Sequence, residues 1–274
     1  RAALIAALAA RTHDLSYSLS LHGPLSDYGS AQGFKWRRAK FVSVITQHLL
    51  DGLPALIGAD LPDHLPIQPM GVDTDTLKPD GPYTPANPNE PLRLFSCARL
   101  NIVKGHQDLM KAVRLMIDAG QDIQLEIAGE DDAGGGGYHK VLDQLIIDLN
   151  LQGNVRLLGA IDGDAVATKL KAAHIFVLAS WHEPLGVAYM EAMSCGVPTI
   201  GTRAGGVPEL INDGENGILV PPKDPAALAV ALRDLAADPD RAKRLAKAGR
   251  ESIVKGFRSS LGAEMLLREI TRDT

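Results

Sequence analysis

The sequence predicts an α/β protein built on parallel β-sheets. From residue 92 onward, short apolar runs rich in β-branched residues alternate with longer segments of helical periodicity. This alternation is typical of parallel strands joined by helices that cover both faces of a sheet. A Pro/Asn-rich passage at 77–91 has no apolar periodicity and predicts a linker between two domains. With 274 residues, 45% of them hydrophobic, the chain can bury one large core or two ordinary ones.

The expected elements follow the chain in order. An Ala-rich helix opens it at 1–10, strands follow at 17–21 and 41–45, and a helix covers 45–58. After the linker, strands are expected at 92–98, 123–129, 154–159, 175–180 and 198–202. Helices are expected at 105–120, 138–150, 164–173 and 184–196, with further helical segments over 224–272. We therefore expect an N-terminal domain over 1–80, a linker over 81–91, a C-terminal domain over 92–255 and a final helix over 256–274.

Composition excludes several classes of function. Lys and Arg (28) against Asp and Glu (33) give a net charge of −5, which offers no overall attraction to nucleic acid or anionic lipid. No apolar run approaches the roughly 18 residues of a membrane span, so we expect at most peripheral membrane contact. Cys97 and Cys195 predict two buried thiols and a cytoplasmic location. Because the chain opens inside a helix without an initiating Met, we expect it to be part of a longer protein.

Metal and cofactor signals are weak. Asp-x-Asp occurs three times, at Asp73/Asp75, Asp162/Asp164 and Asp238/Asp240, and each is better explained by turn or helix-cap chemistry. The stretch "HEPLG" lacks the second His of the His-Glu-x-x-His zinc motif. We predict metal-independent chemistry with no cofactor.

The stretch "HEPLGVAYME" (182–191) carries two carboxylates. Glu183 follows the strand at 175–180, Pro184 fits the first position of the next helix, and Glu191 is expected about two turns into it. In open parallel sheets, ligands bind at this edge. Free N–H groups near Leu185, Gly186 and Val187 would suit a diphosphate.

Carboxylates are poor partners for phosphate but good acceptors for sugar hydroxyls. The two glutamates therefore indicate a ligand that carries both phosphate and sugar. The alternative is that Glu183 is a charge favoured by the helix dipole and that Glu191 is a surface residue.

Three further positions follow other expected strands. Arg99 and Lys104 lie on the loop after the strand at 92–98, where they could neutralise a pyrophosphate without metal. Gly129 ends the strand at 123–129. The alternative for the two cations is a solvated surface loop.

Three motifs carry a resemblance to a known family: "ARLNIVKGH", "EPLGVAYMEAMSCGVPTIGTRAGGVPELI" and "GENGILVPPKDPAALA". The chain resembles the nucleotide-sugar-dependent retaining glycosyltransferases of the GT-B fold, glycosyltransferase family 4. The resemblance implies two Rossmann-like domains, with the donor held mainly by the second domain and the acceptor by the first. It also implies that the helix over 256–274 returns to the first domain. It assigns the diphosphate to Arg99 and Lys104, the ribose hydroxyls to Glu191, and the transferred sugar to Glu183 with the backbone that follows.

The first domain resembles the same family through "SLHGPLSDYG", "FVSVITQHL" and "PMGVDTDTLKP". The resemblance makes His22 a candidate catalytic residue near the anomeric centre, although a lone His at a strand end is otherwise more often structural. The usual glycine-rich opening of that domain does not precede Arg1, so we expect the domain to be incomplete. Met70 and His174 depart from the residues common in the family, and neither change touches the proposed donor contacts.

The resemblance implies transfer of a sugar from a nucleotide-diphosphate sugar to a hydroxyl of a saccharide or glycolipid acceptor, with retention. The product would serve cell-surface polysaccharide or glycolipid synthesis. Glu183 and His22 are the catalytic candidates, and no protein nucleophile is assigned. Two alternatives stay open: a nucleotide-sugar-binding fragment without turnover and a GT-B-fold sugar-nucleotide epimerase. We expect the present chain alone to bind its donor without transferring it.

Overall fold

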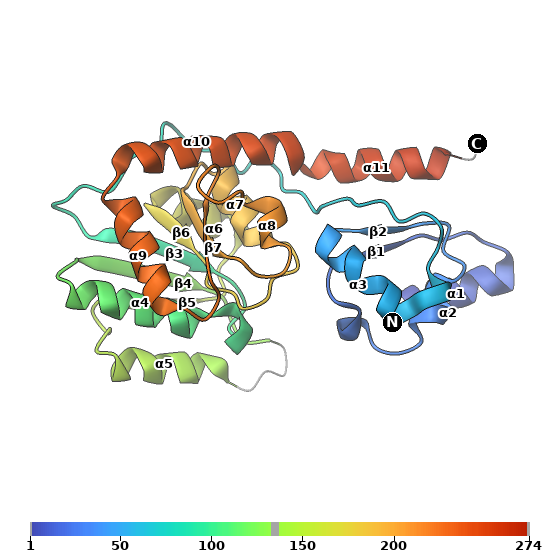
Figure 1. The fold of residues 1–274 in the computed structure, drawn as a ribbon, viewed down its shortest axis with the longest axis horizontal. Coiled ribbons are helices and arrows are strands. Elements are labelled where there is room, and N and C mark those ends of the chain that lie inside the picture. Colours follow the sequence, from blue (N-terminus) through green and yellow to red (C-terminus); the bar gives the residue numbers. More distant parts are fainter. Residues whose placement is uncertain (1, 133–136, 273–274) are drawn as a thin grey trace. The chain divides into compact units, whose positions relative to one another are not determined.

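The structure is a computed structural model that describes residues 2–132 and 137–272. The chain divides into two compact units (Figure 1). Unit 2 is Val72–Arg258, and unit 1 combines the residues up to Gly71 with those from Ser259 onward. Each unit contains parallel strands, in agreement with the predicted α/β class.

Unit 2 alternates strands and helices along its length. Its strands are β3 Leu92–Cys97, β4 Ile123–Ala128, β5 Val155–Gly159, β6 Ile175–Val177, β7 Thr199–Thr202 and β8 Ile218–Val220. Its helices are η3 Ile102–Lys104, α4 His106–Asp118, α5 Tyr138–Asp148, α6 Gly163–Ala172, α7 Val187–Ser194, α8 Val207–Leu210, α9 Pro225–Ala236 and α10 Pro239–Gly256.

The six strands form one parallel sheet in the order β5-β4-β3-β6-β7-β8. Numbered within the unit, this is the order 3-2-1-4-5-6 of a doubly wound Rossmann fold. The chain runs outward from β3 to one edge and then returns through β6 to the other edge. The boundary between β3 and β6 is therefore the topological switch point, where ligands bind in such sheets.

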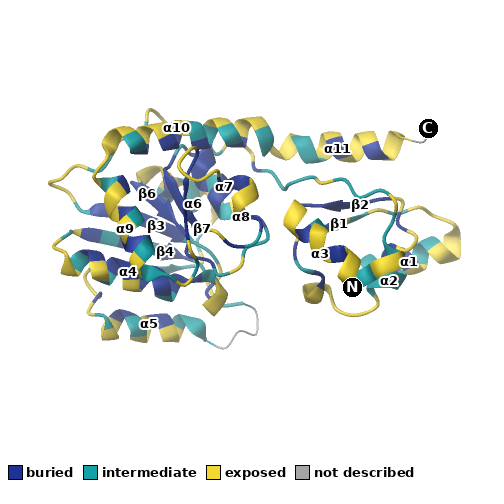
Figure 2. Cartoon of the chain, viewed as in Figure 1, coloured by how far each residue is buried: buried dark blue, intermediate teal, exposed yellow. Residues whose placement is uncertain are grey.

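The core of unit 2 lies between this sheet and its helices. The strands β3, β4, β6, β7 and β8 are largely buried, whereas the helices alternate buried and exposed residues (Figure 2). Residues one helical turn apart in α4, including Leu109, Val113 and Met116, are at most 3% exposed and join the core. Helix α4 packs beside α5 and α9, and α7 packs beside α10. Apolar strands and amphipathic helices thus bury each other as the sequence pattern predicts.

The Asp-x-Asp pairs have the turn and cap chemistry that was predicted. Asp162 accepts a hydrogen bond from the N–H of Ala165 at 2.8 Å, and Asp238 accepts one from the N–H of Arg241 at 2.9 Å. Asp73 closes a turn by accepting from the N–H of Asp75 at 2.9 Å. Each first aspartate thus serves the backbone that follows it.

The predicted helix at 184–196 begins later than expected. Helix α7 starts at Val187, and Gly186 precedes it with φ 102°. A residue with this left-handed backbone cannot continue an α-helix, so the assignment of Pro184 to the first helical position was wrong. Glu191 consequently lies about one turn into α7. Strand β8 and the short helix α8 were not among the predicted elements.

The boundary between the units falls after Gly71, whereas the sequence suggested residue 80. The segment after Gly71 is attached to unit 2 by side chains of that unit. Arg250 donates to the carbonyl oxygens of Thr74 and Leu77, each at 2.8 Å, and the Ser194 hydroxyl donates to Leu77 at 2.6 Å. This polar anchoring explains why residues before the Pro/Asn-rich passage pack with unit 2.

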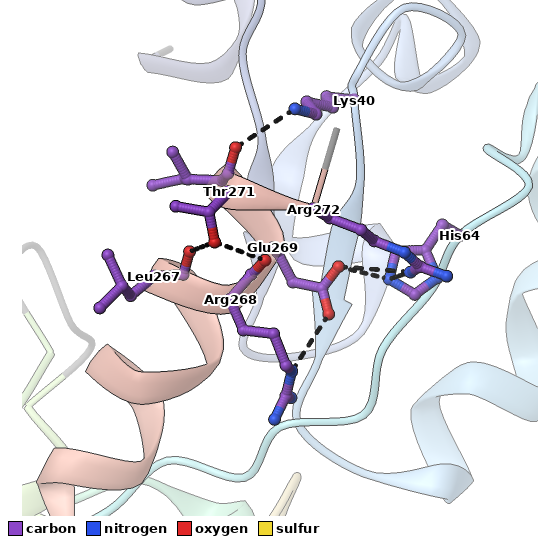
Figure 3. Close-up of polar contacts among 8 residues, drawn as sticks. Lys40, His64, Leu267, Arg268, Glu269, Thr271 and Arg272 are labelled. Atoms are coloured by element: carbon purple, nitrogen blue, oxygen red, sulfur yellow. Dashed lines mark hydrogen bonds and ion pairs between the residues drawn. The ribbon is translucent and has the colours of Figure 1, made fainter. Parts of the chain in front are cut away.

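Unit 1 contains a small parallel sheet of β1 Leu19–Leu21 and β2 Val42–Val44. Its helices are α1 Ala2–His13, η1 Leu25–Tyr28, α2 Gln32–Trp36, α3 Gln47–Ile57, η2 Gly58–Asp60 and α11 Ser259–Thr271. Figure 3 shows how α11 is held: Glu269, whose side chain is 6% exposed, lies 2.7 Å from His64 Nε2. Burial alone would raise the pKa of the Glu269 carboxyl. The hydrogen bonds from His64 and Arg272 outweigh this effect, so the pKa lies below its ordinary value.

Among the residues that the structure describes, no helix is both long and apolar enough to cross a membrane.

Candidate functional site

Two loops meet at the switch point of unit 2, one after β3 and one after β6. Gly105 in the first loop has φ 69°, and a side chain there would collide with the carbonyl oxygen of Ala179. The N–H of Trp181 donates to the carbonyl of Val103 at 2.7 Å and ties the two loops together. Glycine at 105 therefore permits a backbone approach that brings Lys104 beside the loop carrying Glu183.

Lys104 and Glu183 form an ion pair in this place. Lys104 Nζ lies 2.5 Å from Glu183 Oε2, and each side chain is only 12% exposed. The hydroxyl of Ser180 is 3.4 Å from the same carboxylate oxygen. A cation and an acceptor of hydroxyl hydrogen bonds thus share one largely water-excluded position.

The backbone of Glu183 is held from the loop after β7. The N–H of Gly206 donates to the carbonyl of Glu183 at 2.9 Å. Gly205 has φ 58°, and a side chain at this position would collide with the same carbonyl. The turn at Gly205 and Gly206 therefore positions the backbone of Glu183.

Arg99 also has a carboxylate partner. Its Nη1 lies 2.5 Å from Asp132 Oδ1, and Asn101 Nδ2 donates to Asp132 Oδ2 at 3.0 Å. The hydrogen bond from Asn101 and the nearby guanidinium of Arg99 outweigh partial burial and lower the pKa of Asp132. Sequence reasoning did not single out Asp132, which stands 33 positions beyond Arg99.

Glu191 lies within α7 in a different environment. Burial raises the pKa of its carboxyl. Burial also raises the pKa of the Cys97 thiol, at the end of β3, to about 11, and the charge of Glu191 contributes to that shift. Glu191 therefore lies near the carboxyl end of β3, the strand that leads to Arg99.

The other predicted donor contacts are mainly backbone positions. Leu185 is 1% exposed and packs into the core, so only its backbone is available to a ligand. Pro184 is half-buried, and Val187 is exposed at the start of α7. Gly129 has φ 144°, and a side chain there would collide with the carbonyl oxygen of Ala98. These residues line the strand ends without offering a charged group.

His106 is a buried residue that sequence reasoning did not assign to the site. It opens α4 directly after Gly105 and is 0% exposed. Burial lowers the pKa of its imidazole to about 4, against the effect of the neighbouring backbone of Arg99 and Ala98. The ring is therefore neutral at pH 7 and supports the loop that carries both cations.

His22, the predicted catalytic histidine, belongs to unit 1. It follows β1 directly, and its side chain is exposed. The predicted donor-binding residues and Glu183 all belong to unit 2, where Lys104 and Glu183 are in direct contact.

Two cations, two carboxylates with different surroundings and the start of α7 lie along the carboxyl ends of β3 and β6. The cations can stabilise a diphosphate, and α7 adds the free N–H groups of a helix start. The carboxylates can accept hydrogen bonds from the hydroxyls of a sugar or a ribose.

A family model described as "Glycosyl transferases group 1" matches residues 84–252, more than half of the chain. A GDP-mannose-dependent alpha-(1-6)-phosphatidylinositol monomannoside mannosyltransferase from Mycolicibacterium smegmatis is 33% identical over 201 residues, which are 69% of this chain and 50% of the relative. An N-acetyl-alpha-D-glucosaminyl L-malate synthase from Bacillus anthracis is 34% identical over 61% of this chain and 42% of the relative. The chain thus spans half or less of the length of these curated relatives.

Solved structures agree with the fold. Anabaena HepE in complex with UDP-glucose superposes with a TM-score of 0.86 and 21% identity, over 99% of this chain and 76% of HepE. Sucrose-phosphate synthase from Thermosynechococcus elongatus gives a TM-score of 0.83 and 23% identity, over 99% of this chain and 72% of the synthase. At these identities the likeness shows the fold alone, and that fold is the GT-B architecture predicted from the sequence motifs.

Proposed function

This chain belongs to the group 1 glycosyl transferases, and from that premise we propose that unit 2 binds the nucleotide-diphosphate sugar of a sugar transfer. The ion pair between Lys104 and Glu183 at the switch point carries the proposal, because it joins a group for phosphate to a group for sugar hydroxyls. In the whole protein, the sugar would pass to a hydroxyl of an acceptor with retention of configuration.

The donor is a phosphate ester, and its diphosphate leaves with the nucleotide. Arg99, Lys104 and the N–H groups at the start of α7 stabilise the charge that develops on the leaving diphosphate. The acceptor hydroxyl attacks the anomeric carbon on the same face of the sugar ring from which the diphosphate leaves. An oxygen of the leaving phosphate takes the proton of that hydroxyl. This route requires no protein nucleophile and no metal ion, so we propose metal-independent transfer.

Glu183 and Glu191 have separate roles in this proposal. Glu183, with the backbone of Pro184, Leu185 and Gly186, holds the hydroxyls of the transferred sugar. Glu191 accepts hydrogen bonds from the ribose, and His22 is kept as a catalytic candidate. The sheltered position of Glu183 and the raised pKa of Glu191 support two distinct environments for the two carboxylates.

The proposed acceptor is a saccharide or glycolipid of the cell surface. The mannosyltransferase that is 33% identical to this chain acts on a phosphatidylinositol monomannoside, which supports a glycolipid acceptor. We also propose a cytoplasmic location, supported by the free thiols of Cys97 and Cys195.

A calorimetric titration with UDP, GDP and ADP in EDTA tests the donor site. We expect saturable binding of one nucleotide, at least tenfold weaker in Lys104→Ala and Glu191→Ala, because each loses a charge-assisted contact. Lys111→Ala, which removes an exposed cation on α4, is the matched control and should bind as the unsubstituted chain does. Failure of the folded chain to bind any of the three nucleotides would refute the proposal.

A second assay distinguishes transfer from epimerisation. In the full-length protein, nucleotide release should require an acceptor, since sugar transfer consumes two substrates. Conversion of the donor to an epimer without an acceptor would contradict the transferase proposal.

A further inference from the structure

Each cation proposed for the diphosphate already has a carboxylate partner. Lys104 is paired with Glu183 at 2.5 Å, where both side chains are 12% exposed. Arg99 is paired with Asp132 at the same distance, where the side chains are 67% and 38% exposed. The four groups have a formal net charge of zero, so an incoming diphosphate meets neutralised cations rather than free ones.

We propose that Asp132 and Glu183 are resident counter-ions that the diphosphate of the donor displaces and that reclaim Arg99 and Lys104 when the nucleoside diphosphate leaves. This inference rests on the proposed donor site. It adds Asp132 to the site as a residue that sets nucleotide affinity, and it gives Glu183 a second role beside sugar binding.

The two counter-ions differ in what displacement costs. Asp132 is partly exposed and keeps the hydrogen bond from Asn101 at 3.0 Å. Water can therefore solvate its carboxylate when Arg99 moves away, and separating the pair costs little free energy. Glu183 is sheltered, and the Ser180 hydroxyl at 3.4 Å is a weak replacement for an ammonium. A sheltered carboxylate that loses its cation needs new hydrogen-bond donors.

The hydroxyls of the transferred sugar can supply those hydrogen bonds, but a nucleoside diphosphate, which lacks that sugar, cannot supply them there. The intact donor therefore compensates Glu183 for the loss of Lys104, whereas the product does not. After transfer, Glu183 competes with the product for Lys104 and favours its release. Exchange of counter-ions thus weakens product binding more than donor binding.

Asp132→Asn tests the exchange without touching Glu183. The variant keeps the side-chain shape and removes the charge that competes for Arg99, so the affinity for the nucleoside diphosphate should rise about 2–5-fold. Glu183→Gln should raise that affinity by up to about tenfold, because its pair is less exposed, and should lower the preference for intact donor over nucleoside diphosphate. Thermal unfolding of both variants checks that they remain folded.

Glu130→Gln is the matched control. It removes the same charge from an exposed position two residues before Asp132, so it reports the long-range effect of net charge alone. We expect the gain for Asp132→Asn to exceed the gain for Glu130→Gln at every ionic strength.

The outcomes separate this inference from the proposed function. Nucleotide binding that is unchanged or weaker in Asp132→Asn, while Lys104→Ala still weakens binding at least tenfold, would overturn the exchange. If no nucleotide binds, titration with inorganic pyrophosphate, which has neither base nor sugar, tests the exchange separately. Tighter pyrophosphate binding by both variants than by Glu130→Gln would support the exchange even then, and equal binding would overturn it.

Discussion

Glu183 and Glu191 are chemically identical side chains whose surroundings give them different properties. Glu183 shares its position with the ammonium of Lys104. Glu191 is buried enough that its pKa is raised. A carboxylate beside a cation can give up that cation to an anionic ligand. A desolvated carboxylate, by contrast, is stabilised most by hydrogen bonds from hydroxyl groups.

Glu191→Ala should weaken nucleotide binding about 10–100-fold, because hydrogen bonds to a charged acceptor contribute about 1.5–3 kcal/mol. The measurement is a calorimetric titration of both proteins with a ribonucleotide and with its 2′,3′-dideoxy form. If Glu191 holds the ribose hydroxyls, the variant and the unsubstituted chain should bind the dideoxy form with equal affinity. An equal penalty with both nucleotides would contradict the assigned role.

The site could be predicted only in part at this scale. Residue type and position after a strand indicated Arg99, Lys104 and Glu183 as a group at one sheet edge, and Glu191 was expected within the helix that follows Glu183. The sequence carries no sign of which charges pair, because Asp132 is 33 positions from Arg99 and Glu183 is 79 positions from Lys104.

The loops between elements, more than the elements themselves, shape the site. Gly105 and Gly205 allow backbones from different βα units to approach so closely that a side chain would collide with a carbonyl oxygen. Positive φ alone would tolerate a substitution at a modest cost, but a backbone collision forces the loops apart.

Gly205→Ala should destabilise unit 2 by about 1–3 kcal/mol more than Gly214→Ala. Both glycines have positive φ, at 58° and 79°, but a side chain at Gly214 meets nothing within 4 Å. The comparison therefore isolates the collision with Glu183 from the conformational cost, and chemical denaturation measures it. Equal destabilisation would show that the Gly205 turn does not position Glu183 by close approach.

The start of α4 makes unit 2 sensitive to acid. His106 has a folded-state pKa of about 4, below the ordinary value of about 6.5. Between these two pH values the imidazole is protonated in the unfolded chain but neutral in the folded chain. Its contribution to stability is therefore present at pH 7 and is lost as the pH falls from about 6.5 toward 4.

Between pH 7 and pH 5, His106 should account for about 2 kcal/mol of lost stability. His106→Gln should remove that part of the slope, and His182→Gln, at an exposed position, should retain it. Urea denaturation at the two pH values provides the measurement. An unchanged slope in His106→Gln would mean that the imidazole is not held neutral by burial.

Helices and strands were predicted correctly where the local sequence pattern determines them. They were missed or misplaced where contacts with distant residues determine their position. The strands at 92–98 and 123–129 and the amphipathic helix at 105–120 follow from apolar periodicity. The start of α7 does not, because it depends on the left-handed backbone of Gly186, where a side chain would also collide with the ring of Tyr189. Strand β8, which is three residues long, was not predicted either.

At the scale of the whole molecule, the chain consists of two compact units with separate strands and cores. The residues proposed to bind the donor all belong to unit 2, and the candidate His22 belongs to unit 1. The order of the strands in unit 2 could not be predicted from periodicity. The alternation of strands and helices indicates that the strands are parallel, but it does not indicate which strands are neighbours in the sheet. The GT-B architecture was predicted from the motifs rather than from the pattern.

A bound nucleotide should stabilise unit 2 selectively. At a free concentration of 100 times its Kd, the nucleotide adds about 2.7 kcal/mol to the unit that binds it. We expect calorimetric unfolding to resolve two transitions, with only the transition of unit 2 moving to higher temperature. Tryptophan emission from Trp36 in unit 1 and Trp181 in unit 2, each retained alone by Trp→Phe substitution of the other, assigns the transitions. A shift confined to unit 1 would place the nucleotide elsewhere.

The most direct test of the account is a crystal structure of this chain with the nucleoside diphosphate that the titration identifies. The account predicts the diphosphate within hydrogen-bond distance of Lys104 and Arg99 at the carboxyl ends of β3 and β6, with Glu183 and Asp132 moved off their cations. The ribose hydroxyls should face Glu191. A nucleotide bound away from this sheet edge, with the pair of Lys104 and Glu183 intact, would contradict it.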